Sequence, residues 1–119
     1  MTARRVRAKY GAIKVQIDGI TFDSKAEAAR YGELKQLEAD GHITELVLQP
    51  KFELAPSVKL AGSSRATPPL RYYADFSYRD HLGKIVVEDV KGLITEGYRI
   101  KRHLLKALHD IDIVEVRRK

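Results

Sequence analysis

Apolar and polar residues alternate in several short runs of the chain, which is the pattern of half-buried β-strands. The first two runs, residues 12–17 and 20–22, flank Asp18-Gly19, a dipeptide typical of a tight hairpin turn. The sequence therefore predicts an N-terminal β-hairpin. Residues 1–9 precede it and are rich in arginine and lysine, so we expect them to form a flexible basic arm.

A first helix is predicted from residue 25 to about residue 39. Ser24 is a good N-cap, the segment is rich in Ala, Glu, Leu and Lys, and Gly41 marks its end. A second helix is predicted over residues 96–109.

Further strands are predicted between and after the helices, and we expect them to join one sheet. Their ranges are 43–48, 52–55, 71–79, 84–90 and 111–116. The strand, helix and strand at the C-terminal end favour a parallel pairing of the last two strands. Residues 56–70, which contain Gly62-Ser63-Ser64 and Pro68-Pro69, have little periodicity and are expected to form a surface loop. The fold class is therefore α/β or α+β, with a mixed central sheet flanked by helices.

The second helix has an apolar face if its residues are placed on a helical wheel. Ile100, Leu104 and Leu108 lie together, and Leu105 lies at their edge. We expect this face to point inward. Lys101 falls within the same arc, where its ammonium either reaches a charged site or extends to solvent.

The composition limits the class of protein. A chain of 119 residues has room for a single domain, which we place at residues 10–119, and the absence of cysteine suits a reducing compartment such as the cytoplasm. No apolar stretch is long enough for a signal peptide or a membrane span. The net charge of +6 favours an anionic partner such as nucleic acid.

Candidate chemistry gathers in the two strands that precede the second helix. Strand geometry places Asp89 and Lys91 on one face and Glu88 on the other. The preceding strand contains Asp75 among aromatic and apolar residues, and a short turn makes it the antiparallel neighbour. Two adjacent, partly buried carboxylates repel each other unless a cation intervenes, so Mg²⁺ would resolve the conflict. The alternative is a simple surface ion pair between Asp89 and Lys91.

Glu27 is a third candidate acid, for which two interpretations stay open. Ser24-x-x-Glu27 is a capping box, in which the glutamate satisfies a backbone N–H at the helix start. Glu27 also shares a helical stripe with Tyr31 and Leu34, which directs it toward the sheet.

The order of these motifs resembles the PD-(D/E)XK nuclease superfamily. Glu27 in an early helix is followed by Tyr73-Ala-Asp75-Phe and then by Val87-Glu-Asp-Val-Lys-Gly92, and the match runs from about residue 20 to the C-terminus. Within the superfamily the pattern is most similar to phage endonuclease I type Holliday-junction resolvases and to small phage-encoded proteins of uncharacterised function. Tyr72 and Ala74 depart from the common Pro-Asp spelling, and Asp89 stands where many relatives have Glu.

The resemblance implies a restriction-endonuclease-like core and a set of roles. Asp75, Asp89 and the Val90 carbonyl would bind Mg²⁺ or Mn²⁺, Glu27 would hold a second ion or its water, and Lys91 would act on the attacking water and the phosphorane. Residues expected to contact the DNA backbone are Lys101, Arg102, His103, Arg4, Arg5, Arg7 and Lys9.

The leading expectation is a structure-selective DNA endonuclease of the host cytoplasm, either a junction resolvase or a nickase, that works as a homodimer when two cuts must be coordinated. A nonspecific or restriction-like nuclease is the second. The third is a nucleic-acid-binding or assembly protein that has the nuclease fold without turnover.

Overall fold

The computed structural model describes residues 4–7, 13–91 and 93–117. Within them the chain forms two helices, α1 (Lys25–Ala39) and α2 (Glu96–His109). The strands are β1 (Arg4–Arg7), β2 (Ile13–Ile17), β3 (Ile20–Phe22), β4 (Thr44–Leu48), β5 (Lys51–Ala55), β6 (Leu70–Tyr73), β7 (Phe76–Arg79), β8 (Ile85–Val90) and β9 (Ile113–Val116). Neither helix is long and apolar enough to cross a membrane.

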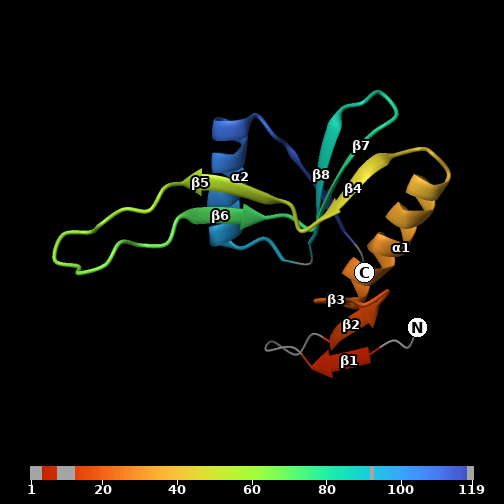
Figure 1. Cartoon of the computed structure of the whole chain (residues 1–119), viewed down its shortest axis with the longest axis horizontal. Helices are drawn as coiled ribbons and strands as arrows, with labels where there is room; N and C mark the ends of the chain where they lie inside the picture. Colours follow the sequence, from red (N-terminus) through yellow and green to blue (C-terminus); the bar gives the residue numbers. More distant parts are fainter. Residues whose placement is uncertain (1–3, 8–12, 92, 118–119) are drawn as a thin grey trace.

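The strands form three separate sheets (Figure 1). The central one has the order β4-β7-β8-β9, in which β8 and β9 are parallel and the other pairs antiparallel. The second consists of β5 and β6, and the third of β1, β2 and β3. The expected mixed sheet with flanking helices is confirmed, and so is the parallel pairing of the last two strands.

The N-terminal hairpin is confirmed, and it has one strand more than expected. Asp18 and Gly19 both have left-handed backbone angles, with φ of 55° and 79°, as a tight turn of the primed type requires. Arg4–Arg7 pairs with β2 as β1, so this part of the expected flexible arm is instead a strand. The rest of residues 1–9 lies outside the described residues. A run of basic residues can pair as an edge strand, because only backbone groups form the ladder.

The first helix begins and ends as the sequence predicts. Ser24 Oγ accepts a hydrogen bond from the Glu27 N–H at 3.1 Å, and Gly41 takes a φ of +80° just after the helix. The face that carries Tyr31 and Leu34 is buried against the central sheet and the N-terminal hairpin. The buried residues of this core are Phe22, Ala28, Tyr31, Leu34, Ile43 and Phe76.

A buried ion pair fixes α1 to the sheet. The Arg30 guanidinium donates to both oxygens of Glu88, from Nε at 2.8 Å and from Nη2 at 2.7 Å. Tyr78 also donates its hydroxyl to Glu88, whose side chain is almost completely buried. Because all of these donors converge on one carboxylate, the charge of Glu88 is well compensated despite its burial.

The predicted strand over residues 71–79 is in fact two strands in different sheets. β6 ends at Tyr73 and β7 begins at Phe76, so the chain changes sheets at Ala74-Asp75. β5 pairs with β6 in the two-stranded sheet. The expectation that residues 52–55 belong to the main sheet is therefore wrong. Residue alternation cannot reveal such a break, because each half keeps its own period of two.

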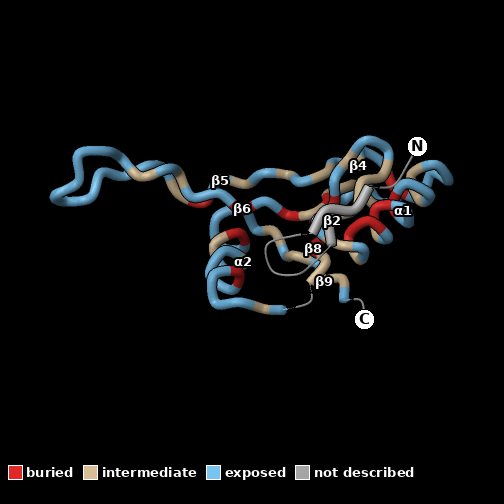
Figure 2. The backbone as a smooth tube through the Cα atoms, turned by 90° about the horizontal axis from the view of Figure 1, so that it is seen from below, coloured by how far each residue is buried: buried red, intermediate tan, exposed pale blue. Residues whose placement is uncertain are grey.

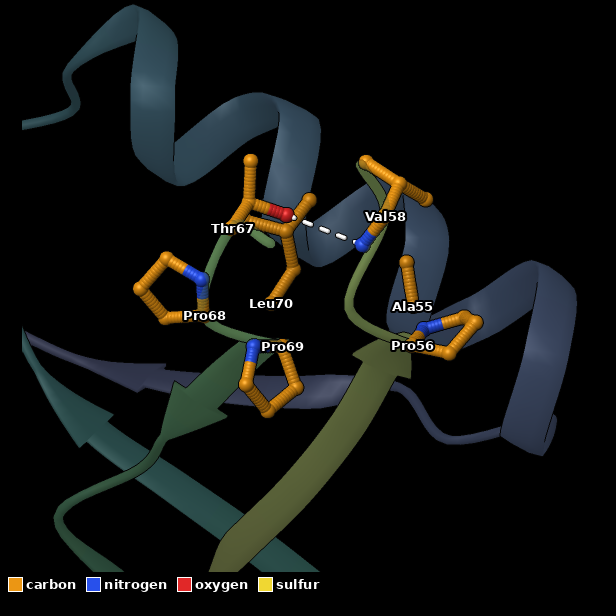
Figure 3. Close-up of a pocket in the computed structure, with 7 residues that line it drawn as sticks. All are labelled: Ala55, Pro56, Val58, Thr67, Pro68, Pro69 and Leu70. Carbon is orange, nitrogen blue, oxygen red and sulfur yellow. Dashed lines mark hydrogen bonds between the residues drawn. The ribbon is translucent and has the colours of Figure 1, made fainter. Parts of the chain in front are cut away.

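Between β5 and β6 the chain extends away from the body as a long arm, residues 56–69 (Figures 1 and 2). Two hydrogen bonds between Val58 and Thr67 hold its two sides together, and one of them is drawn in Figure 3. The expected surface loop is thus confirmed, and hydrogen bonds join its outgoing and returning segments. Close to its base it carries an apolar hollow lined by Ala55, Pro56, Val58, Thr67, Pro68, Pro69 and Leu70 (Figure 3).

The second helix occupies the predicted residues but turns a different face inward. Ile100 and Leu108 are about half exposed, whereas Tyr98 and Leu105 are buried. The buried face contacts β5–β6 and the end of the central sheet, together with Leu54, Tyr72 and Val87. The prediction was wrong because it counted aliphatic residues, and the largest apolar surface on this helix belongs to a tyrosine.

We predict that Arg30→Met destabilises the protein by about 3 kcal/mol, because Glu88 would keep its buried charge and lose its cation. Urea unfolding at neutral pH measures the change. The control is Lys35→Met, which removes an exposed pair with Glu38 and should cost less than about 1 kcal/mol. Equal unfolding midpoints for the two variants would show that the buried pair does not fix α1.

Candidate active site

Asp75 lies where the two-stranded and the central sheets diverge, and it is joined to β8 by reciprocal hydrogen bonds. Its backbone N–H donates to Asp89 Oδ1 at 2.9 Å and to the Glu88 carbonyl at 3.1 Å. Its own Oδ2 accepts the Val90 N–H at 2.7 Å. The sequence prediction that Asp75 lies beside Asp89 is confirmed, and the contact is made through backbone amides.

The second oxygen of Asp89 is the exceptional atom of this cluster. Asp89 is 2% exposed, and its Oδ2 accepts no hydrogen bond from any residue that the structure describes. The nearest cation is Lys91 Nζ at 3.4 Å, so the two side chains share a face as predicted. A buried carboxylate oxygen without a donor is costly, and such an oxygen is available as a ligand.

Lys91 is held by an aromatic ring as well as by Asp89. Its Nζ lies 4.0 Å from the centroid of the Tyr98 ring, a distance typical of a cation–π contact. The Tyr98 hydroxyl donates to Glu115 Oε2 at 2.7 Å, and Arg102 Nη1 donates to the same oxygen at 2.7 Å. The ammonium is therefore positioned by α2 and β9 as well as by its own strand.

Glu27 is buried at the start of α1 and carries an electrostatic cost. It is 6% exposed, and its burial together with the Asp75 carboxylate raises the pKa of Glu27 to about 7. Glu27 and Asp75 line one hollow of about 210 Å³, together with Ile20, Thr21, Phe22, Leu48 and Gln49. The Ser24 half of the capping box is present, because Ser24 Oγ accepts the Glu27 N–H, and the Glu27 side chain is buried on the same helix as Tyr31, as the second interpretation predicts.

The three acids together form a region in which negative charge is disfavoured. Burial raises the pKa of Asp75 and of Asp89 above the ordinary range, although Lys91 acts against this for both. Among the described residues, no three His, Cys, Asp or Glu side chains lie close enough to hold a metal ion as they stand. Asp75 and Asp89 nevertheless suit Mg²⁺, which commonly takes one or two carboxylates and fills its remaining positions with water.

The other predicted site residues are dispersed. Lys101 and His103 are exposed on α2, and Arg102 is engaged by Glu115 and lies 5.4 Å from the Tyr98 ring centroid. Arg4, Arg5 and Arg7 belong to β1, whose side chains are not described, and Lys9 lies outside the described residues. Of the expected residues, the structure brings Asp75, Asp89 and Lys91 into contact and places Glu27 beside Asp75.

The sequence interpretation missed two residues of this region, Tyr98 and Glu115. A signal existed, because Tyr98 and Arg102 are four residues apart on a predicted helix and Glu115 lies within the predicted last strand. That signal was obscured because Arg102 was assigned to the DNA backbone. Its relation to Glu115 depends on the parallel register of β9 beside β8, which pairs Glu115 with Asp89.

Comparison with known proteins places the chain in a family without assigning a function. A family model described as "Protein of unknown function (DUF1064)" matches residues 7–117, almost the entire chain. No curated protein and no solved structure matches it.

We predict that Mn²⁺ or Mg²⁺ at about 100 times its dissociation constant raises the melting temperature by roughly 10 °C. The increase should shrink from about pH 8 to about pH 6, because the proton that Glu27 takes up near its raised pKa of about 7 competes with the ion. Asp89→Asn should abolish it, whereas Asp112→Asn, which alters an exposed partner of Lys106, should leave it intact. If the melting temperature of Asp89→Asn rises as much as that of the wild type, the metal ion does not bind at this site.

Proposed function

The chain belongs to the DUF1064 family of proteins of unknown function, and we propose that it is a metal-dependent nuclease that hydrolyses phosphodiester bonds in DNA. The observation that carries the proposal is the buried pair Asp75 and Asp89, in which Asp89 Oδ2 accepts no hydrogen bond and is compensated by the Lys91 ammonium at 3.4 Å. We assign the central sheet, with α1 before it and α2 between β8 and β9, to a PD-(D/E)XK core.

In this proposal Asp75, Asp89 and the Val90 carbonyl would hold Mg²⁺ or Mn²⁺, and Glu27 would hold a second ion or orient its water. When bound, the ion supplies charge stabilisation and a more acidic water molecule. Asp89 Oδ2 supports this assignment, because it lacks a hydrogen-bond donor where a cation would satisfy it. Asp75 supports it too, since its Oδ2 is already oriented by the Val90 N–H.

Lys91 would orient the attacking water and stabilise the negative charge that develops on the phosphorane. Its position supports that role, since Asp89 and the Tyr98 ring together limit where the ammonium can go. Because preorganised charge costs no reorganisation during the reaction, a fixed ammonium stabilises the transition state better than a mobile one.

The substrate class rests on charge. The chain carries +6, and phosphate contacts from basic residues would supply most of the affinity for DNA. Exposed Lys101 and His103 and the basic strand β1 would follow the backbone without reading sequence. We favour a structure-selective enzyme, a junction resolvase or nickase of phage origin that works as a homodimer.

We predict that Asp89→Ala or Lys91→Ala lowers cleavage at least about 100-fold while leaving DNA binding largely intact. The assay compares labelled four-way junction, flap, nicked, duplex and single-stranded DNA in Mg²⁺, Mn²⁺ or EDTA. Lys84→Ala, a lysine outside the cluster, is the matched control and should cut at the wild-type rate. Metal-independent binding without cleavage of any substrate would instead favour the alternative, a binding or assembly protein with this fold.

Two substitutions of Tyr98 should distinguish the contact of its ring with Lys91 from the hydrogen bond of its hydroxyl to Glu115. Tyr98→Phe keeps the ring under the ammonium and loses only the hydroxyl bond to Glu115, so we expect most of the cleavage rate to remain. Tyr98→Leu loses both, and the rate should fall by about 10-fold or more, since a cation–π contact of a shielded ammonium is worth up to about 2 kcal/mol. Single-turnover cleavage rates at saturating metal measure the difference. Equal rates for the two variants would show that the ring does not position Lys91.

A further inference from the structure

The small sheet β5–β6 has one covered and one open face. Helix α2 packs on one side of it, where Leu54 and Tyr72 are buried (Figure 2). No described element covers the other side, which we call the outer face. Because side chains alternate along each strand, the outer face carries the exposed residues Lys51, Glu53, Arg71 and Tyr73.

Tyr73 is the unusual member of the outer face. It is 57% exposed, and no other phenylalanine or tyrosine in the described part of the chain is classed as exposed. The strand register sets Lys51 directly opposite Tyr73, and Arg71 opposite Glu53. An open aromatic ring with a lysine across from it and an arginine two residues along is the arrangement that binds single-stranded nucleic acid, in which bases stack and phosphates pair with cations.

The charge of this region points to the same occupant. From residue 51 to residue 73 the chain has four basic residues, Lys51, Lys59, Arg65 and Arg71, and one acid, Glu53, a net charge of +3. Lys59 and Arg65 lie on the exposed arm, which continues the strands outward. Pairing of this basic region with the same region of a second copy would be opposed by like charge, whereas a nucleic-acid strand brings the opposite charge.

The outer face lies next to the candidate active site. Tyr73 precedes Asp75 by two residues, so their Cα atoms are at most about 7 Å apart. The other strand is tied to the same point, since the Gln49 N–H donates to the Asp75 carbonyl and the Ala74 N–H donates to the Pro50 carbonyl. A strand of nucleic acid with a phosphate at Asp75 would therefore reach Tyr73 within one or two nucleotides.

We infer that the outer face of β5–β6 binds an unpaired stretch of DNA, with Tyr73 stacked on a base next to the scissile phosphate and Lys51 and Arg71 on the backbone. This inference rests on the proposed function and adds to it the feature that selects the substrate. Bases in continuous duplex are already stacked and are not free to meet the ring, whereas those at a branch or a single-stranded end are free. Tyr73 would thereby give preference for branched over linear DNA.

The test is binding in EDTA, where metal-dependent cleavage is absent, to a fluorescent forked DNA and to a blunt duplex of equal length. Tyr73→Ser should weaken binding of the fork by roughly 5- to 150-fold, the range for loss of one base–aromatic stack, and should change duplex binding little. Tyr73→Phe keeps the ring and should bind like the wild type. With 2-aminopurine as the first unpaired base, the wild type and Tyr73→Phe should quench its fluorescence, and Tyr73→Ser should not.

Two further variants separate stacking from charge and from general surface effects. Lys51→Ala should weaken fork binding and lower the slope of log affinity against log salt for the fork by about one, as loss of one phosphate contact does, while the 2-aminopurine quench remains. Leu82→Ser alters an even more open apolar residue, 79% exposed at the β7–β8 turn, and should change neither fork binding nor duplex binding. Urea midpoints equal to that of the wild type show that the variants are folded.

The outcomes distinguish this inference from the proposed function. If Tyr73→Ser binds and quenches like the wild type, or if the wild type does not prefer the fork, the outer face is not the binding surface, whatever the cleavage assay shows. If fork binding depends on Tyr73 but no metal supports cleavage of any substrate, the outer face stands and the nuclease proposal falls.

Discussion

The exchange of hydrogen bonds between Asp75 and the segment Glu88–Val90 is the constraint on which the rest of this structure depends. It joins the two sheets where the chain passes from β6 to β7, and it uses one oxygen of each aspartate for a backbone amide. One oxygen of Asp89 remains without a donor. The same two carboxylates therefore hold the branch of the fold and form the candidate site, so substitution of Asp75 affects stability as well as chemistry.

Because side chains alternate along β8, its two adjacent acids, Glu88 and Asp89, lie on opposite faces of the sheet and belong to different clusters. Glu88 faces α1, where Arg30 and Tyr78 satisfy its charge fully. Asp89 faces the other way, where Lys91 at 3.4 Å compensates it only in part. Adjacent residues of one type thus differ in role because of their partners, and an incompletely satisfied buried group is the better indicator of a functional site.

Much of this could be predicted from local sequence, and the failures share a cause. The bounds of α1 follow from Ser24 and Gly41 at its two ends, those of α2 follow from composition, and the Asp75–Asp89 contact follows from a short turn between strands. The separation of β6 from β7 and the inward face of α2 depend on which surface each element meets. Tyr98 is buried because its ring packs against Tyr72 of β6 and its hydroxyl donates to Glu115 of β9. The periodicity of α2 alone cannot predict these contacts.

Charge is distributed so that the proposed substrate and the proposed ion need each other. A phosphate next to Asp75, Asp89 and Glu27 would be repelled, and burial together with the Asp75 carboxylate already raises the pKa of Glu27. A divalent cation reverses the sign of the local field and makes the same place attractive to phosphate. By linkage, DNA must then increase affinity for the ion as much as the ion increases affinity for DNA. The basic residues elsewhere cannot replace this effect, because their charge is screened over about 10 Å at moderate salt.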